Sequence, residues 1–110
     1  MSKHNDFYQL IAELVDIEIR SHVETRENIA SVLGLTESFV KKVHSPTAEK
    51  HYNVIHLFLL ANHWNIEISD LIPSAKNLSR LVKYEGVSII ELQEKIDAMI
   101  TNLREDKQYE

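Results

Sequence analysis

Polar side chains that can hydrogen-bond to nucleic acid gather between residues 26 and 51 of this 110-residue chain. Lysine can donate to O6 and N7 of guanine, serine or threonine can contact either kind of base, and glutamate can accept from N4 of cytosine. Cationic and amide side chains also bind phosphate oxygens, which positions a protein on DNA. The candidate set is Arg26, Asn28, Thr36, Glu37, Ser38, Lys41, Lys42, Lys50 and His51.

The spacing of these residues suggests two roles. Residues 36–42 would present their polar groups on the outer face of one helix, so we expect base contacts from them. Arg26 and Asn28 begin the preceding helix, and Lys50 and His51 precede a later one. We expect phosphate contacts from these four positions. The alternative for the three lysines of the set is a solvated surface without a ligand.

Two short helices with a tight corner between them are predicted for residues 25–43. Thr25 and Thr36 can cap the two helices, because a threonine hydroxyl accepts a hydrogen bond from a free amide of the first turn. Gly34 follows the first helix, where glycine takes a positive φ without steric cost. Leu35 is expected to fill the corner. The residues expected to face inward at helical spacing are Ile29, Ala30, Leu33, Phe39, Val40 and Val43.

This pattern resembles the helix-turn-helix of the Cro/repressor-like (XRE) family of DNA-binding proteins. The resemblance implies that the second helix enters the major groove of double-stranded DNA, with its N-terminal residues toward the base edges. An ordinary helical corner in an all-α domain is the alternative for the same pattern. The residues that carry the resemblance are Thr25, Ile29, Ala30, Leu33, Gly34, Leu35, Thr36, Val40 and Val43.

Helices on either side complete the expected domain. A first helix is predicted for residues 5–22 and a fourth for residues 51–64. Residues 61–72 are a second point of resemblance, in which Asn65 would end the fourth helix in a left-handed conformation and a short fifth helix would follow. The predicted buried face of the fourth helix is Val54, Ile55, Phe58, Leu59, Ala61 and Trp64.

The chain departs from the family pattern at two places. Asn65 stands where the family usually has glycine. The family also usually has a glycine before the second helix, where this chain has Ser-His-Val-Glu at residues 21–24. With these departures, the resemblance covers residues 6–72 and implies an all-α, five-helix, lambda-repressor-like domain over residues 1–73.

Residues 74–110 are expected to form a C-terminal helical dimerisation segment. Residues 77–84 can make two helical turns, with Leu78, Leu81 and Val82 inward. A helix capped by Ser88 would then run to about Arg104. Its apolar residues recur at alternating spacings of three and four, which is typical of a coiled-coil seam. The alternative is a helix folded back onto its own domain. The seam comprises Ile89, Leu92, Ile96, Met99 and Leu103.

Composition argues against several other classes of protein. The absence of cysteine excludes disulfides and cysteine-ligated metals. No glycine-rich phosphate loop, cysteine nucleophile or serine triad is evident, and the six histidines lack ligand spacing, so we expect no enzyme, no metal and no cofactor. No apolar run is long enough to span a membrane, and the polar start lacks the apolar core of a signal peptide. A cytoplasmic protein is expected.

The charge distribution leaves two functions open. The net charge is −5, whereas residues 25–51 carry four Lys and Arg against three Glu. Together with the resemblance, this local excess predicts a small sequence-specific transcriptional regulator, a repressor of phage or mobile-element type, which binds a palindromic operator as a homodimer. The alternative is a protein-interaction module on the same fold, such as an antirepressor, an antitoxin-like protein or an adaptor.

Overall fold

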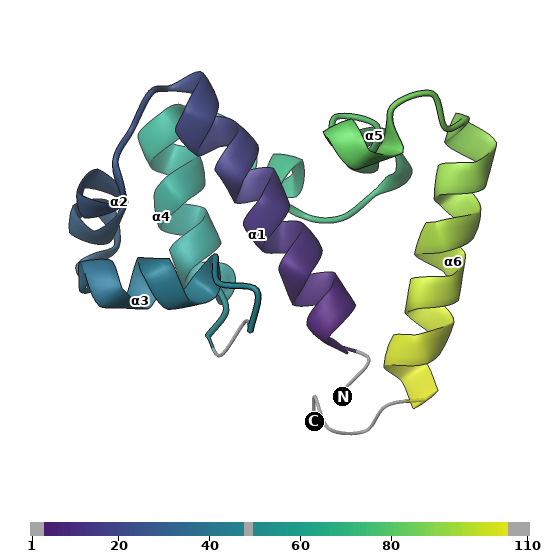
Figure 1. Cartoon of the computed structure of the whole chain (residues 1–110), viewed down its shortest axis with the longest axis horizontal. Coiled ribbons are helices and arrows are strands. Elements are labelled where there is room, and N and C mark those ends of the chain that lie inside the picture. The colour runs from purple at the N-terminus through teal and green to yellow at the C-terminus, as the bar shows by residue number, and fades with distance from the viewer. Residues whose placement is uncertain (1–3, 48–49, 106–110) are drawn as a thin grey trace.

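The computed structural model describes residues 4–47 and 50–105, and this part of the chain contains helices and no strand (Figure 1). The predicted all-α class is therefore confirmed for these residues. No helix among them is long and apolar enough to cross a membrane. The α-helices are α1 (His4–Ser21), α2 (Arg26–Leu33), α3 (Glu37–Val43), α4 (Val54–Trp64), α5 (Ala75–Leu78) and α6 (Ile89–Glu105), and the 3₁₀ helices are η1 (Ile68–Leu71) and η2 (Val82–Tyr84).

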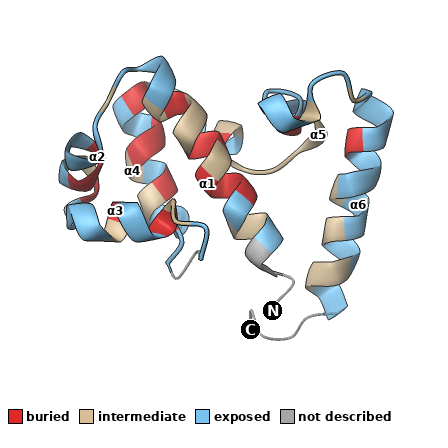
Figure 2. Ribbon diagram, viewed as in Figure 1, coloured by how far each residue is buried: buried red, intermediate tan, exposed pale blue. Residues whose placement is uncertain are grey.

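Helix α1 joins two hydrophobic clusters. In Figure 1 it crosses the middle of the molecule, with α2, α3 and α4 on one side and α5 and α6 on the other. Ile11 and Val15 of α1 belong to the larger cluster, which includes buried residues of α2, α3, α4 and η1. Leu10 and Leu14 face the other way and pack with Leu78, Leu81 and Leu92. Figure 2 accordingly shows buried residues along α1 and α4.

The three helices α1, α2 and α4 end in the same backbone motif. A residue just beyond the end of each helix adopts a left-handed conformation, with φ of 53° at Val23, 68° at Gly34 and 56° at Asn65. The amide of the next residue then reaches back five positions, as from Leu35 to Ala30 at 2.9 Å. This is the Schellman arrangement, which satisfies the last carbonyls of a helix. The expected left-handed positions at Gly34 and Asn65 are thus confirmed.

Val23 is the left-handed residue in the connection between α1 and α2. The amide of Glu24 donates to the carbonyl of Ile19 at 3.0 Å, and that of Val23 donates to Arg20 at 3.2 Å. The Val23 side chain is 87% exposed. A β-branched residue in this conformation is strained, because its Cβ approaches the following carbonyl oxygen. The connection from α1 to α2 therefore keeps a glycine-type turn without glycine.

Helix α4 turns a different face inward from the one predicted. Its buried residues are Leu57, Leu60, Ala61 and Trp64. Val54, Ile55 and Phe58, which were expected in the core, are exposed, so that part of the prediction is wrong. Large apolar residues lie on both the buried and the exposed side of this helix, so periodicity alone does not select the stripe that enters the core. It also begins at Val54 rather than His51, because the Asn53 side chain caps it there.

Smaller differences follow in the next segments. The predicted fifth helix over residues 66–72 is the shorter 3₁₀ helix η1. Leu78 and Leu81 are buried as expected, whereas Val82 is exposed, which corrects its inward placement. The segment 77–84 forms one short α-helical turn and a separate 3₁₀ turn, so Val82 does not follow the spacing of a continuous helix.

Candidate nucleic-acid interface

Helices α2 and α3 meet across the three-residue connection 34–36. Thr25 accepts a hydrogen bond from the amide of Asn28, and Thr36 accepts one from the amide of Phe39, each at 3.2 Å. Both predicted caps are therefore confirmed. The buried residues Ile29, Ala30 and Leu33 of α2, and Val40 and Val43 of α3, belong to the larger cluster. This packing fixes the direction in which the remaining side chains of α3 point.

All nine residues predicted to contact DNA are exposed. On α3, Glu37, Ser38, Lys41 and Lys42 are exposed while Val40 and Val43 are buried, so the polar residues occupy the outer side of the helix. Arg26 and Asn28 are in the first turn of α2, and Thr36 uses its hydroxyl as the cap of α3. Lys50 and His51 lie in the segment before α4. The His51 ring stacks on Tyr8, with ring centroids 3.8 Å apart.

Arg26 and Lys50, which are far apart in the sequence, line one hollow of about 400 Å³ between α1 and the end of α3. Glu13 and Asp16 of α1 line it as well. Asp16 forms an ion pair with Arg20 at 2.8 Å. The two predicted phosphate contacts thus lie beside carboxylates, which reduces the local positive potential.

A half-buried histidine paired with a buried tyrosine supports the end of α3. His44 Nε2 lies 2.8 Å from the hydroxyl of Tyr52, whose side chain is almost completely buried. Burial lowers the pKa of His44, and the charge of Arg26 lowers it further, whereas Asp16 raises it. Burial also raises the pKa of Tyr52. Both groups are therefore neutral near pH 7, so His44 is a structural group and not a cation for a phosphate.

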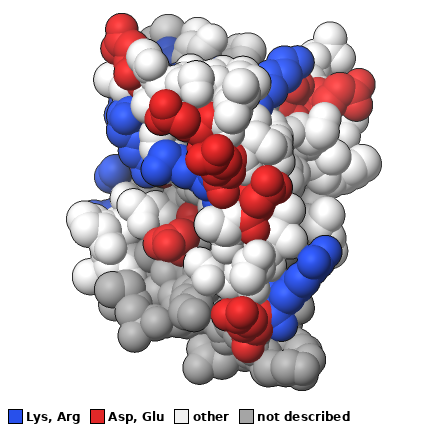
Figure 3. All heavy atoms as spheres, turned by 90° about the vertical axis from the view of Figure 1, so that its right-hand side faces the viewer, with Lys and Arg blue, Asp and Glu red and all other residues white. Residues whose placement is uncertain are grey.

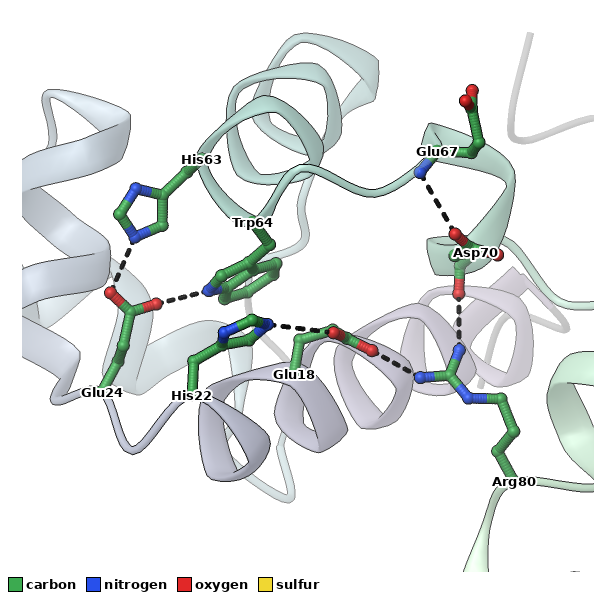
Figure 4. A network of polar contacts seen from close by, with 8 residues as sticks. All are labelled: Glu18, His22, Glu24, His63, Trp64, Glu67, Asp70 and Arg80. Carbon is green, nitrogen blue, oxygen red and sulfur yellow. Dashed lines mark hydrogen bonds and ion pairs between the residues drawn. The ribbon is translucent and has the colours of Figure 1, made fainter.

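A second set of polar residues connects α2 to α4 (Figure 4). The Glu24 carboxylate lies 2.7 Å from His63 Nε2 and accepts a hydrogen bond from Trp64 Nε1. Burial raises the pKa of Glu24, but the hydrogen bonds from His63 and Trp64 lower it, and the net shift is downward. Because Glu24 directly precedes the Thr25 cap, these contacts fix the start of α2 against the end of α4.

The same set continues along α1 to the second cluster. The ring of His22 stacks on Trp64 and lies 3.4 Å from Glu18. Glu18 forms an ion pair with Arg80 at 2.5 Å, and Arg80 also donates to the carbonyl oxygen of Asp70 at 3.2 Å. Sequence reasoning missed these contacts, because the partners are up to 62 positions apart and no local pattern connects them.

The predicted dimerisation seam lies largely against its own chain. Leu92 is fully buried, and Ile96 and Met99 pack against the cluster that contains Leu10 and Leu14. Leu103 is half-buried, and Ile89 is exposed. This packing matches the fold-back alternative for α6. Helix α1, which belongs to the predicted segment 1–73, also packs against the predicted segment 74–110. Residues 1–3, 48–49 and 106–110 of these segments lie outside the described residues.

The outer side of α6 is acidic. Glu91, Glu94 and Asp97 are exposed on it. Figure 3 views the molecule from this side and shows acidic groups running across the face, with fewer Lys and Arg among them. Such a surface repels phosphates, so the candidate nucleic-acid interface is restricted to the opposite end of the molecule, around α2 and α3.

Comparisons with known proteins add no further assignment. No family profile, no curated protein and no solved structure matches the chain. Within residues 4–47 and 50–105, no group of three or more histidine, aspartate or glutamate side chains is arranged to hold a metal ion.

Proposed function

We propose that this chain is a small sequence-specific DNA-binding transcriptional regulator whose α2 and α3 form a helix-turn-helix. The single observation that carries the proposal is the outer side of α3. Glu37 and Ser38 in its first turn and Lys41 in its last turn face solvent, while Val40 and Val43 anchor the helix in the core. The resemblance to the Cro/repressor-like family implies a lambda-repressor-like arrangement and a repressor.

In this arrangement α3 lies in the major groove. Lys41 donates to O6 and N7 of guanine, and Ser38 contacts a neighbouring base. Glu37 accepts from N4 of cytosine and disfavours other bases at that position, because an unpaired carboxylate in the groove repels the phosphates. Arg26 and Lys50 contact the backbone from the hollow that they share.

The electrostatic contribution to binding is small. The candidate interface offers four cations, Arg26, Lys41, Lys42 and Lys50, and Asp16 and Glu13 lie beside two of them. The affinity for one half-site should therefore be modest and should fall as salt is raised. Two copies bound to adjacent half-sites compensate for this weakness, which favours a homodimer on a palindromic operator.

The proposal is tested by binding to DNA from upstream of the chain's own gene, measured by fluorescence anisotropy at moderate salt. Lys41→Ala and Ser38→Ala should each weaken binding by about 5- to 100-fold, since a good base contact contributes roughly 1–3 kcal/mol. Lys76→Ala removes the same charge from an exposed position on α5 and should leave the affinity unchanged. Equal losses in Lys41→Ala and Lys76→Ala, or no binding to any upstream fragment, would contradict the proposal.

The protein-interaction alternative has one observation in its favour. Val54, Ile55 and Phe58 expose a large apolar surface on α4. A nuclease-insensitive, stoichiometric complex with one other protein, together with an absence of DNA binding, would favour this alternative.

A further inference from the structure

The exposed apolar residues of α4 form one continuous face. Val54, Ile55 and Phe58 are 70%, 63% and 58% exposed. Their spacing places them on the same side of the helix, away from the stripe of Leu57, Leu60, Ala61 and Trp64 that enters the core. We call Val54, Ile55 and Phe58 the α4 face. Large apolar side chains exposed together on a small protein are typical of an interaction surface.

The chemistry around this face indicates which partner fits it. From residue 51 to residue 66 the chain has no Asp, Glu, Lys or Arg, although 26% of the whole chain is charged. In a twofold dimer the patch pairs with a copy of itself, and a residue close to the axis faces the same residue of the other copy, so a charge there would face a like charge. A charge-free apolar strip avoids that repulsion. A second copy approaching through the acidic outer side of α6 would not avoid it.

The dimer of the proposed function also needs a surface other than the predicted seam. Leu92 is fully buried in its own chain, and Ile96 and Met99 pack in the same cluster. Their side chains are not free to pair with another copy unless α6 detaches. The α4 face is already exposed in the folded chain.

We propose that the α4 face pairs with the α4 face of a second copy of this chain. The pairing rests on the proposed function in one respect, because that function requires two copies of the chain to bind two DNA half-sites together. The ring of His56 on α4 lies 5.3 Å from that of Phe39 on α3, and both helices contribute to the larger cluster, so the core holds α3 in place relative to α4. Pairing through α4 therefore fixes the spacing of the two α3 helices, as a palindromic operator requires.

The size of the face sets the expected strength of the dimer. A standard interface buries about 800 Å² on each partner, and three side chains with their polar surroundings supply less than that. The dimer should therefore dissociate within the micromolar range. Sedimentation equilibrium of the full chain without DNA, from about 1 to 500 μM, covers this range. The mass should rise with concentration from 12.8 kDa toward twice that value.

Two matched substitutions locate the interface. Ile55 and Ile90 are each the second residue of their helix and are 63% and 72% exposed. Ile55→Glu should remain at the monomer mass at every concentration, while Ile90→Glu should follow the wild-type curve. A glutamate in the first turn favours a helix, so both variants should remain folded, which circular dichroism checks.

Three results would overturn the proposal. The first is a wild-type chain that is monomeric at every concentration, which would leave the α4 face to a different protein. The second is an Ile55→Glu variant that dimerises like the wild type. The third is a loss of the dimer in Ile90→Glu alone. The mass is measured without DNA, so a dimer that binds no DNA would contradict the proposed function and leave this inference standing. DNA binding by a strictly monomeric chain would contradict this inference and leave DNA binding by the chain standing.

Discussion

Val23 is the residue at which the chain and its backbone are in conflict. A β-branched side chain in a left-handed conformation costs roughly 1–2 kcal/mol, and Val23 is 87% exposed, so it gains little from packing. Val23→Gly should therefore raise the free energy of unfolding by about 1 kcal/mol, after allowance for the greater freedom of glycine in the unfolded chain. Urea unfolding measures the difference.

Gly34 gives the matched control for Val23. Its φ of 68° is similar, and a Cβ built on it meets no atom within 4 Å. Gly34→Ala should therefore destabilise the fold by about 1 kcal/mol through the backbone alone, with no steric clash. If Val23→Gly were destabilising while Gly34→Ala were neutral, backbone strain would not be the property that distinguishes these two turns.

His44 couples the end of α3 to pH. Burial lowers its pKa below the ordinary value of 6.5, so below that pH the unfolded chain binds more protons than the folded one. The free energy of unfolding should therefore fall as pH drops from 7.5 through 6.5 to 5.5. His56 adds a change of the same sign, since burial and the nearby His51 lower its pKa as well.

Denaturant unfolding at several pH values tests this expectation. His44→Gln keeps a hydrogen-bonding group near Tyr52 and removes the titration, so its stability should depend less on pH than that of the wild type. A wild-type stability that stays constant or increases between pH 7.5 and 5.5 would contradict the assigned role of His44.

At the scale of elements, the start of α2 depends on the end of α4. Glu24→Ala removes the acceptor of the buried Trp64 ring nitrogen and the partner of His63, and should cost about 1–3 kcal/mol of stability. Glu85→Ala removes an exposed carboxylate from a loop and should change stability by less than about 0.5 kcal/mol. Thermal unfolding compares the two variants, and equal effects would show that the contacts of Glu24 add nothing.

The elements also show what could be predicted from the sequence. Thr25, Thr36 and Gly34 act on backbone groups within a few residues, so local spacing was sufficient to place them. The inner face of α4 was not predictable, because apolar residues lie on both its buried and its exposed side and the packing against α2 and η1 selects one of them. The exposed positions of the site followed from helical spacing, whereas the hollow shared by Arg26 and Lys50 depends on tertiary packing.

At the scale of the whole molecule, α1 contributes buried residues to both hydrophobic clusters and so joins them. Leu92 is fully buried against Leu10 and Leu14, so Leu92→Ala should cost about 2–5 kcal/mol. Because α1 belongs to both clusters, Trp64 fluorescence and helical circular dichroism should report one shared transition at a lower denaturant concentration. Loss of helix signal well before the change at Trp64 would mean that α6 unfolds independently.

The assignment of α3 as the recognition helix is tested most directly by mapping a DNA complex residue by residue. Backbone amide resonances of the full chain would be followed by NMR during titration with a duplex from upstream of its own gene. The proposed function predicts that the largest shifts occur at residues 36–42, with smaller ones at residues 26–28 and 50–51 and none along the outer side of α6. Shifts concentrated on α6, or no shifts at DNA concentrations that saturate binding in anisotropy, would contradict it.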